Sequence, residues 1–314
     1  MTPTSRSAPV LGTAPARLRF RAYAKINLDL RIGPRRLDGF HDLTTVLQSL
    51  ALHDTVTIRA IDGPCRVRCG GLGVPQGRDN LVWQAAQSLW AALGYVGEPR
   101  GADVTLTKRI PVQAGLGGGT SDAVSALRGL CQLWQVSPSP KLLHQVAAQL
   151  GADGPFFLVG GTALGMGRGD EVYSLVEADH YWVVIIVPAR GVSTVRAYDW
   201  LDRDVALMEH GGRSAARNHR VSPVVGGRLN LASLTNDLEK PVVRRRREIR
   251  EATRALAEAG ALVAAMTGSG SAVFGLFATR TQAAVASNVV RRFGVRVIVT
   301  RTLSRDQFAC RFWL

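Results

Sequence analysis

The sequence predicts an α+β fold with two domains, and three observations support that prediction. A glycine-rich stretch at residues 115–119 runs directly into a helical apolar pattern. Segments typical of strands and of helices alternate on both sides of it. The composition then changes at residues 175–179, just before residues 181–187, a continuous apolar run typical of a strand buried on both faces. We therefore expect a tail at 1–17, an N-terminal α/β domain at 18–176 and a C-terminal domain at 177–314.

In the N-terminal domain, apolar alternation and capping residues predict the elements in order. Strands are expected at 18–32, 55–60, 66–69 and 103–108, while residues 42–49 fit either a helix or a strand. One helix, capped by Asp79 or Asn80, runs to about Leu93. Another covers about 140–150 and stops at Gly151. A glycine-rich hairpin follows at 160–170.

In the C-terminal domain, the buried strand at 181–187 leads into a loop at 188–194. A polar, basic surface loop is expected at 209–227 and a helix at about 240–259. Near residue 264 we expect a helix to end, a small-residue loop to turn and an apolar strand to leave. A helix at 283–293 and an edge strand at 295–300 complete the domain.

Composition limits the class of protein. The chain has 314 residues, of which 46% are hydrophobic, enough for a sizeable core. No apolar run approaches the roughly 20 residues of a membrane span, so we expect no membrane contact. The tail lacks the apolar core of a signal peptide, although its basic start leaves a transit peptide as an alternative.

Cysteine usage indicates a cytoplasmic protein. The four cysteines are few and irregularly spaced, which is typical of reduced thiols. Cys65 and Cys69 could ligate a metal, but no second pair of cysteines or histidines has a matching spacing. We expect no metal site there.

The net charge of +15 raises one rival class, a basic nucleic-acid-binding protein. The densest basic run, residues 244–247, falls within a predicted helix and fits a solvated face. The chain has no zinc-finger pattern and no aromatic pattern of an RNA-recognition motif. Polyphosphate ligands explain part of the charge more simply, so we expect no nucleic-acid partner.

The chain is organised around the stretch Pro111-Val-Gln-Ala-Gly-Leu-Gly-Gly-Gly-Thr-Ser-Asp122. Glycines let backbone N–H groups face a ligand, and the start of a helix adds the positive end of its dipole. A phosphate cradle is therefore favoured over an ordinary glycine-rich turn. Thr120, Ser121 or Asp122 can cap the helix. The stretch matches neither a Walker loop, which ends in Gly-Lys-Ser/Thr, nor the dinucleotide fingerprint.

This stretch resembles the ATP loop of the GHMP kinases, the family of galactokinase, homoserine kinase and mevalonate kinase. Its doubled glycine after Gly-Leu-Gly is similar to one branch, the 4-diphosphocytidyl-2-C-methyl-D-erythritol kinases. The resemblance spans about residues 20–300. It implies an N-terminal ATP-binding domain with a left-handed βαβ-type loop motif and a C-terminal ferredoxin-like domain. The loop residues implied to bind ATP are Pro111, Gly115, Leu116, Gly117, Gly118, Gly119, Thr120 and Ser121.

Lys25 and Asn27 stand two apart in a predicted strand and so point to one face. By itself the lysine fits either a strand-edge charge or a cation that reaches a phosphate. Ala-Lys25-Ile-Asn27-Leu resembles the opening motif of the branch. There the lysine lies near the reacting hydroxyl and the transferred phosphate, and the asparagine lines the same pocket. The resemblance therefore implies that Lys25 is catalytic and that Asn27 binds substrate.

Phe40 and His41 follow an Asp-Gly turn that exposes them. Such a pair often belongs to a packed loop, but Arg-x-Asp-Gly-aromatic-His resembles the cytidine-binding segment of the branch. There the aromatic ring stacks on the cytosine and the histidine hydrogen-bonds its edge. Phe40 replaces the usual tyrosine and keeps the stacking face without the hydroxyl. Tyr198 is the candidate for the second aromatic side chain on the cytosine.

Asp153 lies in a tight bend that we expect to join a helix to an apolar strand, between Gly151 and Pro155. An aspartate there could simply accept backbone N–H groups. The segment resembles the Gly-Ala/Ser-Asp-x-Pro motif of the family, whose aspartate is the general base. Gly154 stands where valine or isoleucine is usual, so we expect a looser bend.

The resemblance also implies further contacts. Asn80, Leu81 and Val82 would lie against the adenine, although capping is the simpler role of Asn80. Lys108 would lie at the edge of the nucleotide, although an exposed lysine at a strand end fits it nearly as well. The third glycine motif, Gly268, Ser269 and Gly270, would face the substrate and the phosphates.

The implied reaction is ATP- and Mg²⁺-dependent phosphorylation of the 2-hydroxyl of 4-diphosphocytidyl-2-C-methyl-D-erythritol, in non-mevalonate isoprenoid synthesis. Asp153 would take the hydroxyl proton, while Lys25 keeps Asp153 ionised and stabilises the transferring phosphoryl group. A homoserine or mevalonate type of kinase is the alternative and would have no use for Phe40 and His41. The metal ligands and the order of substrate binding are not evident from the sequence, and both monomer and homodimer are open.

Overall fold

The computed structural model describes residues 17–71, 73–210, 223–225, 228–291 and 296–313. The strands are β1 Leu18–Arg35, β2 His41–Pro64, β3 Arg66–Cys69, β4 Arg100–Thr107, β5 Thr162–Met166, β6 Glu171–Ser174, β7 Trp182–Val187, β8 Val224–Val225, β9 Arg228–Leu229, β10 Val263–Met266, β11 Val273–Phe277 and β12 Arg296–Arg301. The helices are α1 Leu81–Ala92, α2 Gly118–Leu133, α3 Pro140–Leu150, α4 Phe156–Val159, α5 Thr194–His210, α6 Glu239–Arg245, α7 Arg247–Glu258, α8 Arg280–Val290 and α9 Arg305–Cys310, with single 3₁₀ turns at Gly77–Asp79 and Leu231–Ser233.

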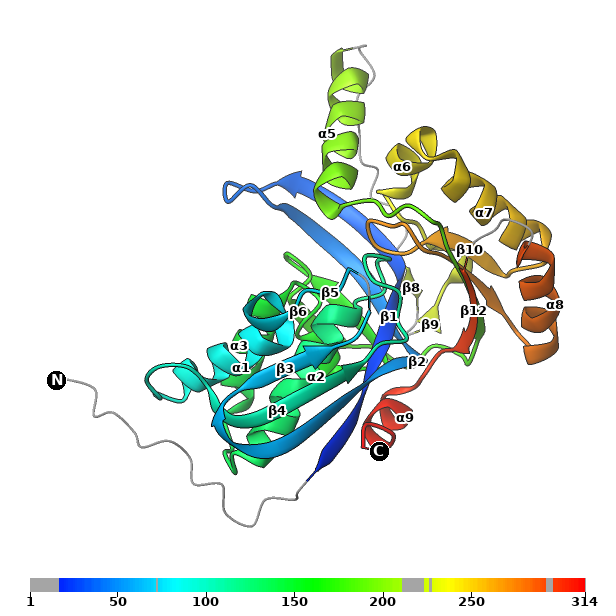
Figure 1. Cartoon of the computed structure of the whole chain (residues 1–314). Coiled ribbons are helices and arrows are strands. Elements are labelled where there is room, and N and C mark those ends of the chain that lie inside the picture. Colours follow the sequence, from blue (N-terminus) through cyan, green and yellow to red (C-terminus); the bar gives the residue numbers. More distant parts are fainter. Residues whose placement is uncertain (1–16, 72, 211–222, 226–227, 292–295, 314) are drawn as a thin grey trace.

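Two large sheets stand side by side (Figure 1). The first has the order β3-β4-β2-β5-β6, with β1 paired to β2. The second has the order β10-β11-β7-β12. Along the chain these strands follow one another as β7, β10, β11 and β12, so the first strand lies in the sheet between the third and the fourth. This is the strand order of a ferredoxin-like domain, as predicted.

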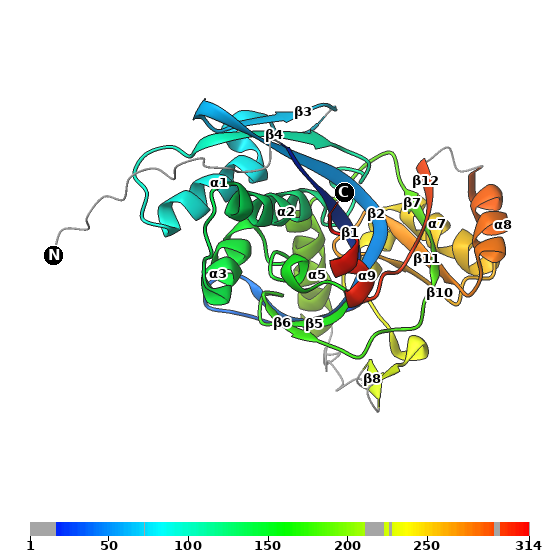
Figure 2. The ribbon, with the colours of Figure 1, turned by 90° about the horizontal axis from the view of Figure 1, so that it is seen from below.

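The first sheet is built on the β1–β2 hairpin, whose 18 and 24 residues are long for strands. The predicted strands at 18–32 and 55–60 lie in it, and residues 42–49, left open between helix and strand, are strand. Parallel strands β3 and β4 are joined through α1, which makes a βαβ unit. Figure 2 shows α1, α2 and α3 gathered on one face of this sheet.

Helix α2 packs closely on the first sheet because a glycine allows it. A Cβ on Gly129 would lie 2.5 Å from both Ile58 and Phe20, side chains of β2 and β1. The apolar stripe of α2, which includes Leu127 and Leu130, is buried in the same core. This packing fixes the N-terminal end of α2 relative to β1.

A shared core joins the two sheets. Ile26 and Leu50 of the first sheet pack with Ile185 and Phe274 of the second. The C-terminal segment then returns to the first sheet, where Phe312 lies 5.2 Å from Phe20 between ring centres. In the described part of the chain, no helix is long and apolar enough to cross a membrane.

Several local predictions were wrong. Residues 240–259 form two helices, α6 and α7, because Arg246 leaves helical geometry (φ −130°, ψ 88°). Its guanidinium donates instead to the carbonyls of Arg190 and Gly191. Residues 263–266 are strand β10, so no helix ends there. The predicted loop at 209–227 lies mostly outside the described residues.

Two corrections concern the glycine loop and the bend at Asp153. Helix α2 begins at Gly118, earlier than expected, and its N-cap is Gly117 rather than Thr120, Ser121 or Asp122. The bend leads into the short helix α4, not into a strand. It is also closed rather than loose, because a Cβ on residue 154 would lie 1.9 Å from the carbonyl oxygen of Ala147.

Candidate active site

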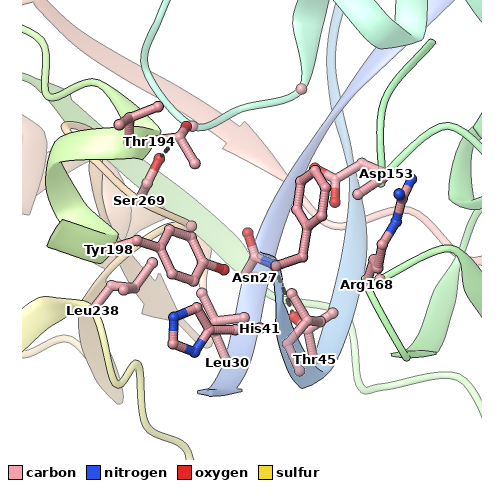
Figure 3. A pocket seen from close by; sticks show the side chains of 18 of the residues that line it. Asn27, Leu30, His41, Thr45, Asp153, Arg168, Thr194, Tyr198, Leu238 and Ser269 are labelled. Atoms are coloured by element: carbon pink, nitrogen blue, oxygen red, sulfur yellow. Dashed lines mark hydrogen bonds between the residues drawn. The ribbon is translucent and has the colours of Figure 1, made fainter. Parts of the chain in front are cut away.

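One cavity of about 570 Å³ collects most of the predicted site residues. Its walls come from β1, β2, the glycine loop before α2, the bend after α3, the β5–β6 turn, α5 and the loop after β10. Both halves of the chain therefore contribute. Figure 3 shows Tyr198 and Ser269 on one side of the cavity, with Asp153 and Arg168 on the other.

Lys25 and Asp153 form an ion pair in this cavity. Nζ of Lys25 lies 2.9 Å from a carboxylate oxygen of Asp153 and donates to Oδ1 of Asn27 at 2.6 Å. The lysine side chain is 5% exposed and that of Asp153 is 29% exposed. The pair therefore combines a buried cation with a carboxylate that a ligand can still reach.

The hydrogen bonds of Asn27 hold this pair in place. Its Nδ2 donates to Oγ1 of Thr45 at 2.8 Å, and Thr45 donates in turn to the carbonyl of Asp29. Its backbone N–H donates to Oγ1 of Thr267 at 3.0 Å. Because Oδ1 of Asn27 accepts from Lys25, the network also fixes the ammonium group.

The glycine loop brings the N-terminus of α2 next to Lys25. Gly117 has a left-handed φ of 71°, which turns the chain into the helix. The first N–H groups of a helix have no partner within it, and the helix dipole makes this end positive. A Cβ on Gly117 would lie 3.0 Å from Cγ of Lys25. An anion at this helix start would therefore be close to the ion pair.

The third glycine motif closes against the first. A Cβ on Gly115 would lie 2.5 Å from the carbonyl oxygen of Thr267, and one on Gly268 would lie 3.2 Å from Oδ1 of Asn27. Gly268 and Ser269 line the cavity. Gly270 packs instead on Met266, where a Cβ would lie 2.8 Å from the sulfur.

His41 and Tyr198 lie together in the same cavity, with ring centres 5.3 Å apart. Nδ1 of His41 is 3.2 Å from the carbonyl oxygen of Gly33, and Nε2 is 3.2 Å from the carboxylate of Asp202. Both partners are acceptors, so each of these contacts is donated by a ring N–H. Burial raises the pKa of Tyr198 to about 12, and the charge of Asp153 adds to this effect.

Phe40 presents a partly open ring to the cavity. Its side chain is 56% exposed, and Cζ of Arg168 lies 4.8 Å from the ring centre. An accessible aromatic face beside His41 and Tyr198 is a stacking surface for a planar ligand.

A second cavity of about 580 Å³ is lined by residues 108–113, which precede the glycines, and by residues 187–189. Pro111 lies here. Asn80 and Leu81 line neither cavity. Asn80 caps α1, since its Oδ1 accepts from the backbone N–H of Val82 at 2.9 Å. Leu81 does approach the glycine loop, because a Cβ on Gly119 would lie 3.4 Å from it.

Lys108 lines the second cavity, but its charge is paired with protein groups. Its Nζ donates to Asp54 and, at 2.6 Å, to Asp122. The three side chains are 11%, 0% and 3% exposed, in the order Lys108, Asp54, Asp122. Asp54 also accepts from the backbone N–H of Ile110 at 2.8 Å. Since Asp122 is the fifth residue of α2, this cluster ties the N-terminal part of the helix to the sheet.

Four residues of the site were not predicted from the sequence: Thr45, Thr267, Arg168 and Asp202. Asp202 carried one usable signal, because it follows Tyr198 by four residues and therefore shares its helix face. Thr45 and Thr267 carried none, since their partner Asn27 is distant from both in the sequence.

Comparison with known proteins shows to which family this chain is similar. The model of the GHMP kinases N-terminal domain matches residues 80–161, and that of the GHMP kinases C-terminal domain matches residues 226–296. A 4-diphosphocytidyl-2-C-methyl-D-erythritol kinase of Moorella thermoacetica is 39% identical over 285 residues, covering 90% of this chain and 98% of the relative. One of Geobacter metallireducens is 40% identical, with 87% and 94% covered.

Solved structures agree. The crystal structure of a 4-(cytidine 5'-diphospho)-2C-methyl-D-erythritol kinase superposes with a TM-score of 0.72 at 29% identity, covering 91% of this chain and 99% of that one. A homoserine kinase from Cytophaga hutchinsonii shares the fold, with a TM-score of 0.67 at 20% identity and coverage of 94% and 97%. The chain therefore belongs to the 4-diphosphocytidyl-2-C-methyl-D-erythritol kinase branch of the ATP-dependent GHMP kinases, and it has their two-domain fold.

Proposed function

We propose that this protein transfers the γ-phosphoryl group of ATP to the 2-hydroxyl of 4-diphosphocytidyl-2-C-methyl-D-erythritol. One observation carries the proposal: a single cavity holds the Lys25–Asp153 pair, the start of α2 and the cluster of Phe40, His41 and Tyr198. The reaction needs these three things, namely a base for an alcohol, an anion site for phosphates and a surface for a nucleobase. The names of the relatives support the same substrate.

Asp153 is the proposed general base. Its carboxylate accepts the proton of the substrate hydroxyl as that oxygen attacks the γ-phosphorus and the bond to the β-phosphate oxygen breaks, leaving ADP. Lys25 has two roles. It holds Asp153 ionised before the reaction, and it stabilises the negative charge of the transferring group. Oδ1 of Asn27 accepts a hydrogen bond from the Lys25 ammonium at 2.6 Å and so holds that group next to both Asp153 and the transferring phosphoryl group.

The glycine loop is the proposed phosphate cradle. Gly118, Gly119 and Thr120 form the first turn of α2, whose N–H groups lack partners within the helix. These donors suit a β-phosphate next to the Lys25–Asp153 pair. Pro111 and the second cavity then offer space for the rest of the nucleotide.

We propose that Mg²⁺ enters with ATP. In the described part of the chain, no group of three or more His, Cys, Asp or Glu side chains could hold a metal. A donor set without such a group fits an ion carried largely by phosphate oxygens and water, as Mg²⁺ commonly is. When bound, the ion neutralises phosphate charge during transfer.

Phe40, His41 and Tyr198 form the proposed cytosine site. The Phe40 ring supplies a stacking face, and Tyr198 a second one. His41 is oriented by Gly33 and Asp202. Loss of one of those bonds would free a ring nitrogen for the polar edge of the base.

We further propose a cytoplasmic protein, monomeric or homodimeric, without a nucleic-acid partner. The four cysteines are free thiols, as suits a reducing compartment. The basic run is largely occupied by protein groups: Arg244 and Arg245 pair with Asp204, and Arg247 pairs with Glu251. Such pairing leaves less positive charge for a phosphate backbone.

The test is ADP release with Mg²⁺-ATP and each of three alcohols: 4-diphosphocytidyl-2-C-methyl-D-erythritol, homoserine and mevalonate. We expect turnover with the cytidyl substrate alone. Turnover with another alcohol instead would keep the kinase and discard the cytosine site. If none of the three is phosphorylated, the proposed reaction is wrong, and salt-dependent binding to DNA or RNA becomes the next measurement.

A further inference from the structure

We propose that Arg168 binds the diphosphate of the acceptor substrate and thereby selects a nucleoside diphosphate ester over an uncharged cytidine ligand. This inference rests on the proposed function. It concerns the middle of the substrate, for which neither the ion pair nor the aromatic cluster provides a partner.

The position of Arg168 in the cavity fits this role. The residue lies in the tight turn between β5 and β6, with Gly167 (φ 67°) and Gly169 (φ 103°) on either side. The carbonyl of Gly167 accepts from the backbone N–H of Leu43 at 2.7 Å, which ties the turn to β2. A Cβ on Gly169 would lie 3.7 Å from Ala152, next to Asp153. Figure 3 shows the Arg168 side chain extending toward Asp153.

The guanidinium of Arg168 also reaches the nucleobase end, because its Cζ lies 4.8 Å from the ring centre of Phe40. The acceptor substrate carries its base at one end, its alcohol at the other and two phosphates between. If the base stacks on Phe40 and the alcohol meets Asp153, the phosphates must cross the space between them. Arg168 borders that space from both ends.

The charge of Arg168 is available for a ligand. Three lysine or arginine side chains line the described cavity: Lys25, Arg35 and Arg168. Lys25 is paired with Asp153, and Nε of Arg35 donates to the carbonyl of Gly39 at 3.2 Å. Arg168 itself forms a long ion pair with Asp170, whose carboxylate oxygen lies 3.9 Å from Nε and so beyond hydrogen-bond distance.

A guanidinium is well suited to a diphosphate. Its planar set of N–H donors can bind two phosphate oxygens at once, while a lysine ammonium offers only a point charge. Stacking on Phe40 limits the freedom of the side chain, so less conformational entropy is lost on binding.

The test measures the binding of cytidine, CMP and CDP to the wild type, Arg168→Met and Arg168→Lys, by calorimetry without ATP. We expect wild-type affinity to rise from cytidine to CDP. Arg168→Met should weaken CDP binding about 10- to 100-fold and leave cytidine within about threefold, with Arg168→Lys in between. Arg254→Gln is the matched control, because it removes one positive charge from an exposed helix face outside the cavity.

Three results would overturn the inference: Arg168→Met retains the preference for CDP, it weakens cytidine as much as CDP, or Arg254→Gln reproduces its effect. The second result would indicate that Arg168 acts only through Phe40. If the wild type binds none of the three ligands, the proposed function itself fails, and this outcome is distinct from the others.

Discussion

Two lysines lie close to the same glycine loop, and their surroundings differ. A Cβ on Gly117 would touch the Lys25 side chain, and one on Gly118 would lie 3.5 Å from Nζ of Lys108. Both side chains are buried and both contact aspartate. Lys25 faces one carboxylate in an open cavity, while Lys108 is held between two buried carboxylates. Burial and pairing alone therefore do not distinguish a ligand-binding cation from one that stabilises the fold.

The number and exposure of the carboxylates make the distinction. Asp153 is 29% exposed, so it can exchange a proton with a ligand. Burial, with a smaller contribution from the charge of Asp54, raises the pKa of Asp122 to about 8 against the opposing charge of Lys108. Burial alone would lower the pKa of Lys108, but the two carboxylates raise it. Asp122 and Lys108 thus hold their protons more tightly than usual, as suits a structural anchor near the start of α2.

The strongest test of this comparison is Asp153→Asn. If Asp153 is the base, kcat should fall about 10²- to 10⁴-fold in the ADP-release assay with saturating substrates. The melting temperature should stay close to that of the wild type, because the side chain is partly exposed and lies in a bend held by backbone contacts. Near-normal turnover would remove Asp153 from the mechanism.

Lys108→Met should act on stability instead. Removing the lysine leaves Asp54 and Asp122 buried together without a cation. Breaking a buried ion pair in this way costs roughly 3–5 kcal/mol of unfolding free energy. Urea unfolding measures the loss. The matched variant Lys25→Met should unfold nearer the wild type but lose turnover. A stable Lys108→Met protein with a raised KM for ATP would reverse the comparison and make Lys108 a nucleotide contact.

The two lysines also show how far the sequence could be read. Both lie in predicted strands, and the resemblance to the kinase branch implied that both contact a ligand. The local pattern was enough for the strands and for α1 and α3. The grouping of Lys25, Asn27, His41 and Asp153 in one cavity followed from the resemblance to the kinase branch. It could not reveal that Asp54, 54 positions before Lys108, neutralises that lysine.

The remaining wrong predictions also arise from features that the local sequence does not show. Arg246 interrupts a helical pattern because its guanidinium donates hydrogen bonds to the carbonyl groups of the distant 190–191 loop. Gly117 starts α2 early through its backbone conformation rather than through a capping side chain. Position 154 requires a glycine, because a Cβ there would collide with the carbonyl oxygen of Ala147 in the preceding helix. Each depends on a contact or a dihedral angle that residue type alone does not specify.

His41 extends the comparison to a third side chain. Like Lys25, it is buried and paired with one partly exposed carboxylate, that of Asp202, which is 39% exposed. The comparison therefore predicts a ligand-binding role. His41→Ala should raise the KM for the cytidyl substrate about tenfold, which corresponds to one lost hydrogen bond. The KM for ATP should not change. An equal rise in both KM values would contradict the role given to His41.

Asp122→Asn gives the smallest effect and tests the proton held by the Lys108 cluster. The pKa of Asp122 is about 8 in the folded protein, against an ordinary value of 3.8. The folded state thus holds this proton more tightly than the unfolded chain does. Its contribution to stability is complete below about pH 4 and is lost as the pH rises toward 8.

Asparagine has no proton to lose. Between pH 5 and pH 9 the melting temperature of the wild type should therefore fall relative to that of Asp122→Asn, on the order of a few degrees. All other titratable residues are common to both proteins, so the difference between the two curves reports the Asp122 carboxyl together with its coupling to Lys108 and Asp54. Parallel curves would mean that Asp122 is already ionised at pH 5. The Lys108 cluster would then lose the feature that sets it apart from the Lys25–Asp153 pair.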